Sequence, residues 1–152
     1  MYKLSLPEYN FACKKNKDVD FIFDIIRKKY VKITPEEWVR QHIVHFLITE
    51  KKYPASLIGV EVSLTYNKMQ KRADIVCYNS QAQPLVLIEC KAPSITITQS
   101  VFEQIATYNS IFKVPYLVVS NGIAHYACTI NYEEKSFLFL KDIPSYEDLK
   151  IG

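Results

Sequence analysis

The chain has 152 residues, of which 49% are hydrophobic, and these values predict one globular domain with its own core. The formal net charge is only +3, which excludes the strongly basic composition of a protein that coats DNA. Three glycines are present and neither GxGxxG nor a P-loop signature occurs, which excludes the usual phosphate-binding turns of dinucleotide and P-loop proteins.

The cysteine pattern and the hydropathy pattern both favour an ordinary intracellular protein. No two of the four cysteines form a CxxC pair, so a zinc site is not expected, and Cys77 and Cys90 are expected to be buried hydrophobic residues. The first residues do not show the pattern of a signal peptide, so none is expected, and no apolar run is long enough to span a bilayer. We therefore expect a cytoplasmic protein without a membrane partner.

A helix is predicted over residues 34–52, after a mixed segment to which we assign no definite structure. Thr34 is a candidate N-cap, Pro35 occupies the first helical position, and Glu37 completes a capping box. Apolar residues then recur at helical spacing. They are Trp38, Val39, Ile43, Phe46, Leu47 and Ile48.

The rest of the chain alternates strands with a second helix. Strands are expected at residues 57–66, 71–78, 84–91, 114–120, 124–131 and 136–140. The second helix is expected over residues 98–112, with an apolar face that carries Val101, Ile105, Tyr108 and Phe112. This order predicts an α/β fold with a mixed β-sheet flanked by helices, including a right-handed βαβ unit. No linker or repeat divides the chain, so residues 1–152 form one domain with a core at about 34–131.

Charged residues interrupt two of these strands. Residues 85–88 are a continuous apolar run typical of a buried central strand, yet Glu89, Cys90 and Lys91 follow it directly. Side chains alternate along a strand, so Glu89 and Lys91 project to one face. If this strand pairs with the preceding one, Asp74 and Glu89 converge. Two carboxylates suit a hard cation such as Mg²⁺, and the lysine suits a phosphate oxygen or an attacking water.

A plainer explanation of these charges remains open. Glu-x-Lys also occurs at Glu50 and at Glu133, where a helix end and a polar turn explain it by solvation. Asp74, Glu89 and Lys91 would then be an ion-pair set at the sheet edge without any chemistry.

The order of these motifs resembles the PD-(D/E)XK nuclease superfamily, and within it the N-terminal nuclease domain of type I restriction enzyme R subunits. The resemblance spans roughly residues 20–128. The matching segments are Thr34-Pro-Glu-Glu-Trp-Val-Arg-Gln41, Arg72-Ala-Asp-Ile-Val76, Leu87-Ile-Glu-Cys-Lys-Ala-Pro93, Gln104-x-x-x-Tyr108-Asn109 and Ser120-Asn-Gly122. It implies a restriction-endonuclease-like core.

The resemblance also implies roles for individual residues. Asp74 and Glu89 would bind Mg²⁺ or Mn²⁺, and Lys91 would contact the scissile phosphate or orient the nucleophilic water. Gln104 and Tyr108 match a Gln-x-x-x-Tyr motif, share one helical face, and would bind a backbone phosphate or hold Lys91.

An extra metal ligand on the first helix is common in the superfamily. Glu37 matches that place, although capping explains it equally well, and Glu61 is a further candidate. Ala73 stands where the superfamily name has proline, a frequent substitution.

The expected function is metal-dependent hydrolysis of DNA, without the translocase motor of the R subunits. Expected partners are DNA and other restriction-modification subunits, and a homodimer would supply the two sites that a double-strand break needs. The alternatives are an inactive domain that binds nucleic acid or a restriction complex, and a purely structural domain.

Overall fold

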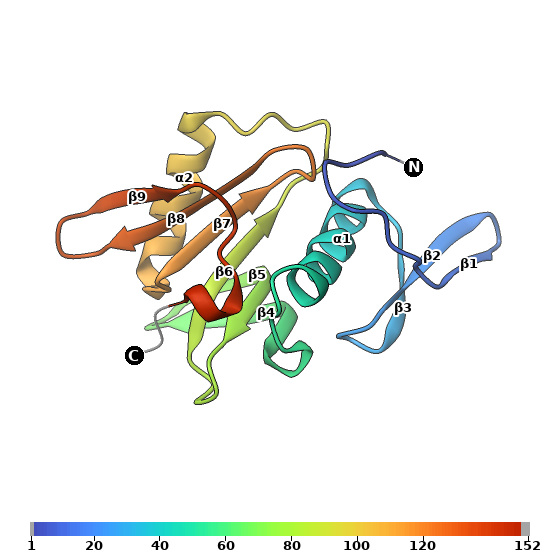
Figure 1. Cartoon of the computed structure of the whole chain (residues 1–152), viewed down its shortest axis with the longest axis horizontal. Helices are drawn as coiled ribbons and strands as arrows, with labels where there is room; N and C mark the ends of the chain where they lie inside the picture. The colour runs from blue at the N-terminus through green and yellow to red at the C-terminus, as the bar shows by residue number, and fades with distance from the viewer. Residues whose placement is uncertain (1, 150–152) are drawn as a thin grey trace.

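A six-stranded mixed sheet forms the centre of the molecule, and its strands lie side by side in chain order (Figure 1). The computed structural model describes residues 2–149. The strands are β4 (Ile58–Tyr66), β5 (Met69–Tyr78), β6 (Pro84–Cys90), β7 (Tyr116–Ser120), β8 (His125–Asn131) and β9 (Ser136–Leu140). Their observed bounds lie within two residues of the predicted ones. β6 and β7 run parallel, which confirms the predicted βαβ crossover, and the other neighbouring pairs are antiparallel.

The first helix, α1 (Pro35–Thr49), begins where the sequence predicted. Thr34 caps it, because its side-chain oxygen accepts a 3.0 Å hydrogen bond from the amide of Glu37. The Glu37 carboxylate does not complete a capping box but binds arginine and glutamine side chains instead. The helix ends three residues before the predicted Lys52, which has a left-handed φ of +60° and so cannot continue it.

The second helix, α2 (Gln99–Asn109), is continued by a short 3₁₀ turn (Ser110–Phe112), and its buried face differs from the predicted one. Phe102, Ala106 and Asn109 are buried, whereas Tyr108 is half exposed and Ile105 only partly covered. The predicted stripe was therefore one residue out of phase. The observed phase turns Phe102 rather than Val101 toward the sheet, which buries the larger apolar side chain, and it leaves the hydroxyl of Tyr108 toward solvent.

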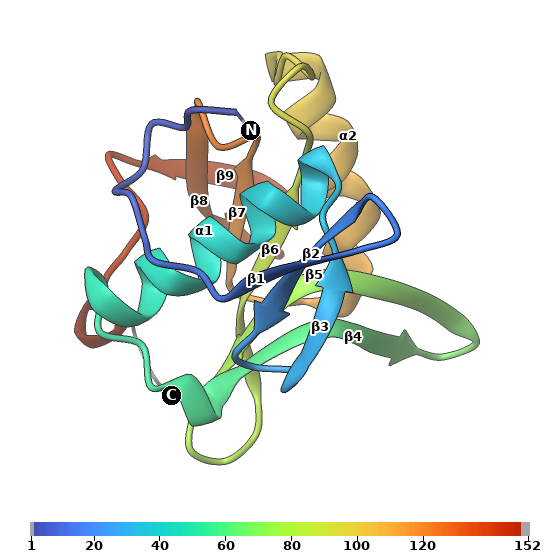
Figure 2. The same cartoon turned by 90° about the vertical axis from the view of Figure 1, so that its right-hand side faces the viewer.

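The two helices cover opposite faces of the sheet, as predicted (Figures 1 and 2). Val39, Ile43 and Leu47 of α1 pack with Ile75 and Ile88 in one cluster. The cluster on the α2 side contains Ala73, Leu87, Phe102, Leu117 and Val119, among others. The strands β6 and β7 thus lie between two hydrophobic layers, which explains their continuous apolar sequences.

Residues 2–33, which the sequence left unassigned, form a separate small sheet and a cover for α1. The strands β1 (Cys13–Asn16), β2 (Val19–Asp24) and β3 (Lys29–Lys32) pair antiparallel in that order. Phe11 packs its ring at 4.8 Å from His42 on the outer side of α1. The outer face of α1 is therefore also covered. Among residues 2–149, no helix is long and apolar enough to cross a membrane.

One step in β4 changes which faces the strands present. Val60 and Ile75 pair and pack on the α1 side, whereas the following pair, Val62 and Ala73, packs on the α2 side. Glu61 lies between them with a left-handed φ of +56°, which is rare for a residue with a side chain. The β4–β5 ribbon therefore turns over at Glu61, beside Asp74.

Candidate active site

The two predicted acids lie at neighbouring positions of paired strands. Ile75 pairs with Ile88 in the antiparallel ladder between β5 and β6, and Asp74 and Glu89 are the next residues along the two strands. Side chains at opposite positions of paired strands lie on one face of the sheet, so the two carboxyl groups are neighbours, and Asp74 contributes to raising the pKa of Glu89. The structure therefore brings together the carboxylates that the sequence singled out.

Backbone and side-chain contacts hold the Asp74 carboxylate. Its Oδ2 atom accepts a 2.7 Å hydrogen bond from the amide of Cys90, and its Oδ1 atom lies 3.3 Å from a guanidinium nitrogen of Arg40. The first contact ties the carboxylate to the end of β6. The second places a buried positive charge from α1 against it.

Glu89 is more deeply buried, and a lysine neutralises it. The Lys71 Nζ atom lies 2.6 Å from Glu89 Oε1, and both side chains are largely covered. Burial raises the pKa of Glu89 above its ordinary value, Lys71 acts in the opposite direction, and Asp74 raises the pKa further. A second positive charge near Glu89 would further favour the ionised form of this buried carboxyl group.

The predicted cationic and polar residues meet Glu89 in one pocket. A hollow of about 230 Å³ is lined by Lys71, Glu89, Lys91, Gln104 and Tyr108, together with Ile105 and Asn109. Lys91 follows β6, and Gln104 and Tyr108 come from neighbouring turns of α2. Lys71 also lies over the Tyr108 ring, 4.9 Å from its centroid. The sequence prediction did not include Lys71, although its place on the strand of Asp74 is a usable signal.

Glu37 lies away from this pocket, in a buried polar network. Its Oε1 atom accepts a 2.8 Å hydrogen bond from Arg27, and its Oε2 atom accepts one of 3.0 Å from Gln41. Arg40 contacts both oxygens of Glu37 and also reaches Asp74. Glu37 therefore connects to the site through Arg40, and its role as a metal ligand stays a prediction that these contacts do not favour.

Two other acids are linked to Asp74, Glu61 through the shared contact with Arg40 and Glu36 through the effect of the Asp74 charge. Glu61 accepts a short hydrogen bond from Arg40, and a second contact of 3.3 Å joins it to Arg72. Glu36 is exposed at the first turn of α1, and its pKa is raised, first by partial burial and then by the charge of Asp74. The sequence offered Glu61 as a candidate but missed Glu36, because the choice between adjacent helical positions depends on the angle at which α1 crosses the sheet.

The two carboxylates fit Mg²⁺ or Mn²⁺ if water or substrate supplies the remaining ligands. Within residues 2–149, no group of three or more His, Cys, Asp or Glu side chains is arranged to hold a metal. Asp74 and Glu89 are a pair of carboxylates, and Mg²⁺ commonly binds one or two carboxylates while water and substrate phosphates supply the other oxygens. Arg40 and Lys71 lie against the same carboxylates and offset their charge.

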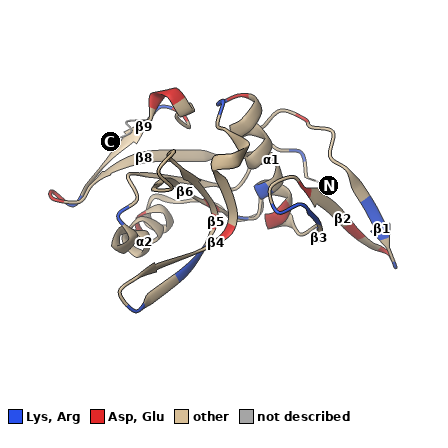
Figure 3. Cartoon of the chain, turned by 90° about the horizontal axis from the view of Figure 1, so that it is seen from below, with Lys and Arg blue, Asp and Glu red and all other residues tan. Residues whose placement is uncertain are grey.

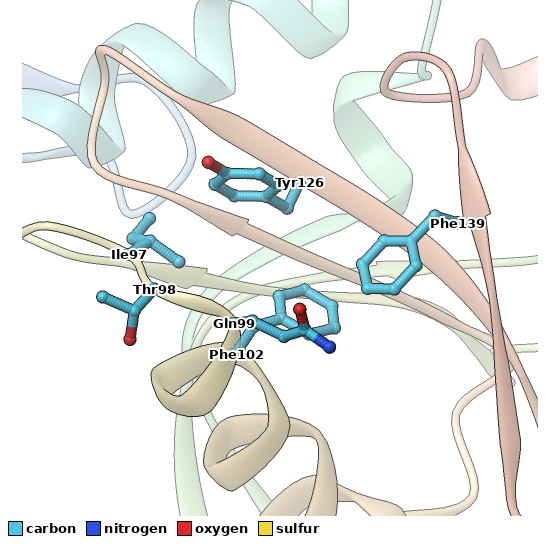
Figure 4. Close-up of a pocket in the computed structure, with 6 residues that line it drawn as sticks. All are labelled: Ile97, Thr98, Gln99, Phe102, Tyr126 and Phe139. Atoms are coloured by element: carbon cyan, nitrogen blue, oxygen red, sulfur yellow. The ribbon is translucent and has the colours of Figure 1, made fainter.

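A second hollow of about 340 Å³ lies at the start of α2 and carries different chemistry (Figure 4). The rings of Phe102, Tyr126 and Phe139 line it, together with Ile97, Thr98 and Gln99. It has neither carboxylate nor amine among its lining residues, so it lacks the groups needed for metal-assisted hydrolysis.

The comparisons with known proteins agree with this arrangement. Residues 35–144 match the family described as the type I restriction enzyme R protein N terminus (HSDR_N). The chain belongs to this family. The matched HSDR_N region contains α1, both carboxylates, Lys91 and α2, and so includes the whole candidate site. No curated protein matches the chain at a significant level.

A solved structure shows the same fold. It is a fragment described as the HsdR subunit of a type I restriction enzyme from Vibrio vulnificus YJ016, and its TM-score with this chain is 0.55 at 18% identity. The match covers 77% of this chain and 24% of that one, so the present chain spans about a quarter of the length of that structure. The mixed sheet flanked by helices is thus the restriction-endonuclease-like core that the motifs implied.

Proposed function

We propose that this HSDR_N chain is a Mg²⁺- or Mn²⁺-dependent endonuclease that hydrolyses phosphodiester bonds of DNA. The observation that carries the proposal is the position of Asp74 and Glu89 on paired strands, next to a pocket that contains Lys91. Family membership supports the same conclusion, because these three residues stand within the matched region. DNA as substrate and a cytoplasmic restriction-modification complex as setting are parts of this proposal.

Asp74 and Glu89 are the residues that would hold the metal ion. When bound there, the ion would polarise a phosphate oxygen and lower the pKa of a water molecule. The hydrogen bond from the Cys90 amide keeps one Asp74 oxygen in place, so the carboxylate is oriented before any ligand arrives. Burial raises the pKa of Glu89, and a cation bound beside this carboxyl group would favour its ionised form.

The amine and the helix residues would act on the phosphate. Lys91 lines the pocket beside Glu89, where it would stabilise the negative charge that grows on the phosphate in the transition state. Gln104 and Tyr108 lie on the α2 wall of the same pocket. Their amide and phenol groups would donate hydrogen bonds to a backbone phosphate and so position it.

A plasmid-cleavage assay with Mg²⁺, Mn²⁺ or chelator tests the proposal. We expect the wild type to cleave in the presence of metal, and Lys91→Ala to lose cleavage while its melting temperature stays near that of the wild type. Lys141→Ala is the matched control, because Lys141 is exposed at the far edge of the sheet and should cleave normally. Full cleavage by Lys91→Ala in a clean preparation would refute the assignment.

The alternative function is an inactive domain that binds nucleic acid or a restriction complex. One observation favours it: Arg40 and Lys71 already neutralise the two carboxylates, and no third ligand completes the set among the described residues. A Mg²⁺- or Mn²⁺-dependent rise in melting temperature discriminates the two functions. The endonuclease should show it, and the inactive domain should not.

A further inference from the structure

The hairpin formed by β4 and β5 extends away from the body of the protein. It reaches past the helices and the small sheet, on the side opposite β9 (Figure 2). The ladder continues to its tip, where Tyr66 pairs with Met69 across a two-residue turn of Asn67 and Lys68. Among the described residues, no helix or sheet packs on the tip of this hairpin, so both faces of the ribbon are open to a partner there.

The chemistry of this hairpin favours an anionic partner. The stretch from residue 62 to residue 73 contains Lys68, Lys71 and Arg72 and no acid. Figure 3 shows the basic residues along the projecting hairpin. The side chain of Arg72 is 68% exposed, and the one ion pair found for it within residues 2–149, with Glu61, is partly exposed and so contributes little. No ion pair is found for Lys68 within residues 2–149.

The tip also presents an exposed aromatic residue and an exposed thioether. Tyr66 is 43% exposed and Met69 is 49% exposed. Isolated apolar residues on a surface are common, but here they share one face of a basic ribbon with Lys71, two residues along the strand. These side chains can lie against sugars or base edges once the charges have neutralised the phosphates.

The hairpin leads directly to the candidate active site. Lys71 pairs in the ladder with Leu64 and reaches into the pocket of Glu89, Lys91 and Tyr108. The turnover of the ribbon at Glu61 is what places Lys71 on the α2 side. A nucleic-acid backbone that lies along the hairpin from its tip would therefore reach the pocket at Lys71.

We propose that the β4–β5 hairpin is an arm that binds duplex DNA through Lys68 and Arg72 and guides a phosphate toward the pocket. This deepens the proposed function and rests on it for the nature of the substrate. The major groove of B-DNA admits a two-stranded β-ribbon, whereas the deep, narrow major groove of A-form RNA does not. The absence of acids from residues 62–73 makes the arm complementary to the phosphate backbone.

The test is DNA binding by the full chain in chelator, where no cleavage occurs. Fluorescence anisotropy of a labelled 30-base-pair duplex is measured over a series of salt concentrations. The double variant Lys68→Gln/Arg72→Gln should bind roughly tenfold more weakly at about 0.1 M salt, with a salt slope lower by about 2. The matched control is Lys135→Gln/Lys141→Gln, which removes the same charge from exposed positions at the opposite edge of the sheet.

Each outcome decides the inference separately from the nuclease proposal. An unchanged affinity and slope in the hairpin variant overturns the arm, and so does an equal loss in the control. Tighter binding to single-stranded DNA or to duplex RNA than to duplex DNA overturns the assignment of the partner. A wild type that binds through the hairpin but never cleaves leaves the arm intact and removes the nuclease. If the wild type cleaves DNA but the hairpin variant binds DNA as tightly as the wild type, the nuclease proposal stands and the arm is refuted.

Discussion

The Oδ2 atom of Asp74 accepts a 2.7 Å hydrogen bond from the backbone amide of Cys90. This bond lies just beyond Ile75 and Ile88, the last residue pair of the ladder between β5 and β6, and it joins the two strands beside the site. It fixes one carboxylate oxygen and leaves the other to face Arg40. A backbone amide thus orients the Asp74 carboxylate, and replacing a nearby side chain does not remove that donor.

Asp74→Asn should separate the charge of this residue from its structural bond. The carboxamide oxygen still accepts the Cys90 amide, so we expect a loss of only about 1 kcal/mol in the free energy of unfolding. The rise in melting temperature caused by Mn²⁺ should disappear, because one of two carboxylates has lost its charge. Differential scanning fluorimetry measures both. Asp142→Asn is the control, since Asp142 is an exposed residue of a surface ion pair, and a wild-type metal response in Asp74→Asn would remove Asp74 from the site.

Arg40 and Arg72 contact the same carboxylate from positions of very different burial. The Arg40 side chain is 8% exposed and that of Arg72 is 68% exposed, and both approach Glu61. Arg40→Gln should lower the free energy of unfolding by about 3–5 kcal/mol, because it leaves buried carboxylates without a counter-charge. Arg72→Gln should change it by less than about 0.5 kcal/mol. Urea unfolding compares the two variants, and equal losses would contradict the role of Arg40 as the buried counter-charge of these carboxylates.

Asp24 should make the stability of the protein sensitive to acid. Its side chain is fully buried, and although burial acts against the charge, hydrogen bonds from Arg27, Gln41 and the Ile26 amide lower its pKa below the ordinary value of 3.8. A carboxylate with a lowered pKa contributes stability above its unfolded pKa and loses it as the pH falls through the folded value. Asp24→Asn should therefore cost about 3 kcal/mol at pH 7 and progressively less below pH 3.8.

The control for Asp24 is Asp20→Asn in the same strand. Asp20 forms an exposed pair with Lys15 at 3.3 Å, so its loss should change the free energy of unfolding by less than about 0.5 kcal/mol. Guanidinium titrations at several pH values provide the comparison. A constant difference between Asp24→Asn and the wild type from pH 7 down to pH 3 would show that the charge of Asp24 is not the stabilising group.

Phe102 and Tyr108 of α2 should have opposite effects on stability and on function. Phe102 is 2% exposed in the core, so Phe102→Ala should cost about 3–5 kcal/mol. Tyr108 is 50% exposed and contacts Lys71, so Tyr108→Ala should cost only about 1 kcal/mol or less but should weaken cleavage. Chemical unfolding and the plasmid assay distinguish them. A large loss of stability in Tyr108→Ala would mean that the predicted stripe, and not the observed one, carries the packing.

The sequence predicted the helices and strands of residues 34–140 well, for local reasons, and it singled out the two acids that the structure places on paired strands. Thr34 and Pro35 locate the start of α1 because capping depends on a few adjacent residues. The apolar run before Glu89 identifies a strand covered on both sides, because charge after such a run is unusual. The phase of α2 was missed, since a helix with apolar residues at both 101 and 102 leaves two faces open and only the neighbouring sheet chooses between them.

What the sequence by itself determined is the set of strands and helices, their order, and the acids and lysine that interrupt a buried strand. Local propensity and the alternation of side chains suffice for these. What only the tertiary structure decided is which charges face one another: Arg40 lies against both Asp74 and Glu37, and Lys71 lies against Glu89. Such pairings depend on the crossing of α1 over the sheet and on the left-handed residue Glu61, and neither follows from residues that are close in the chain.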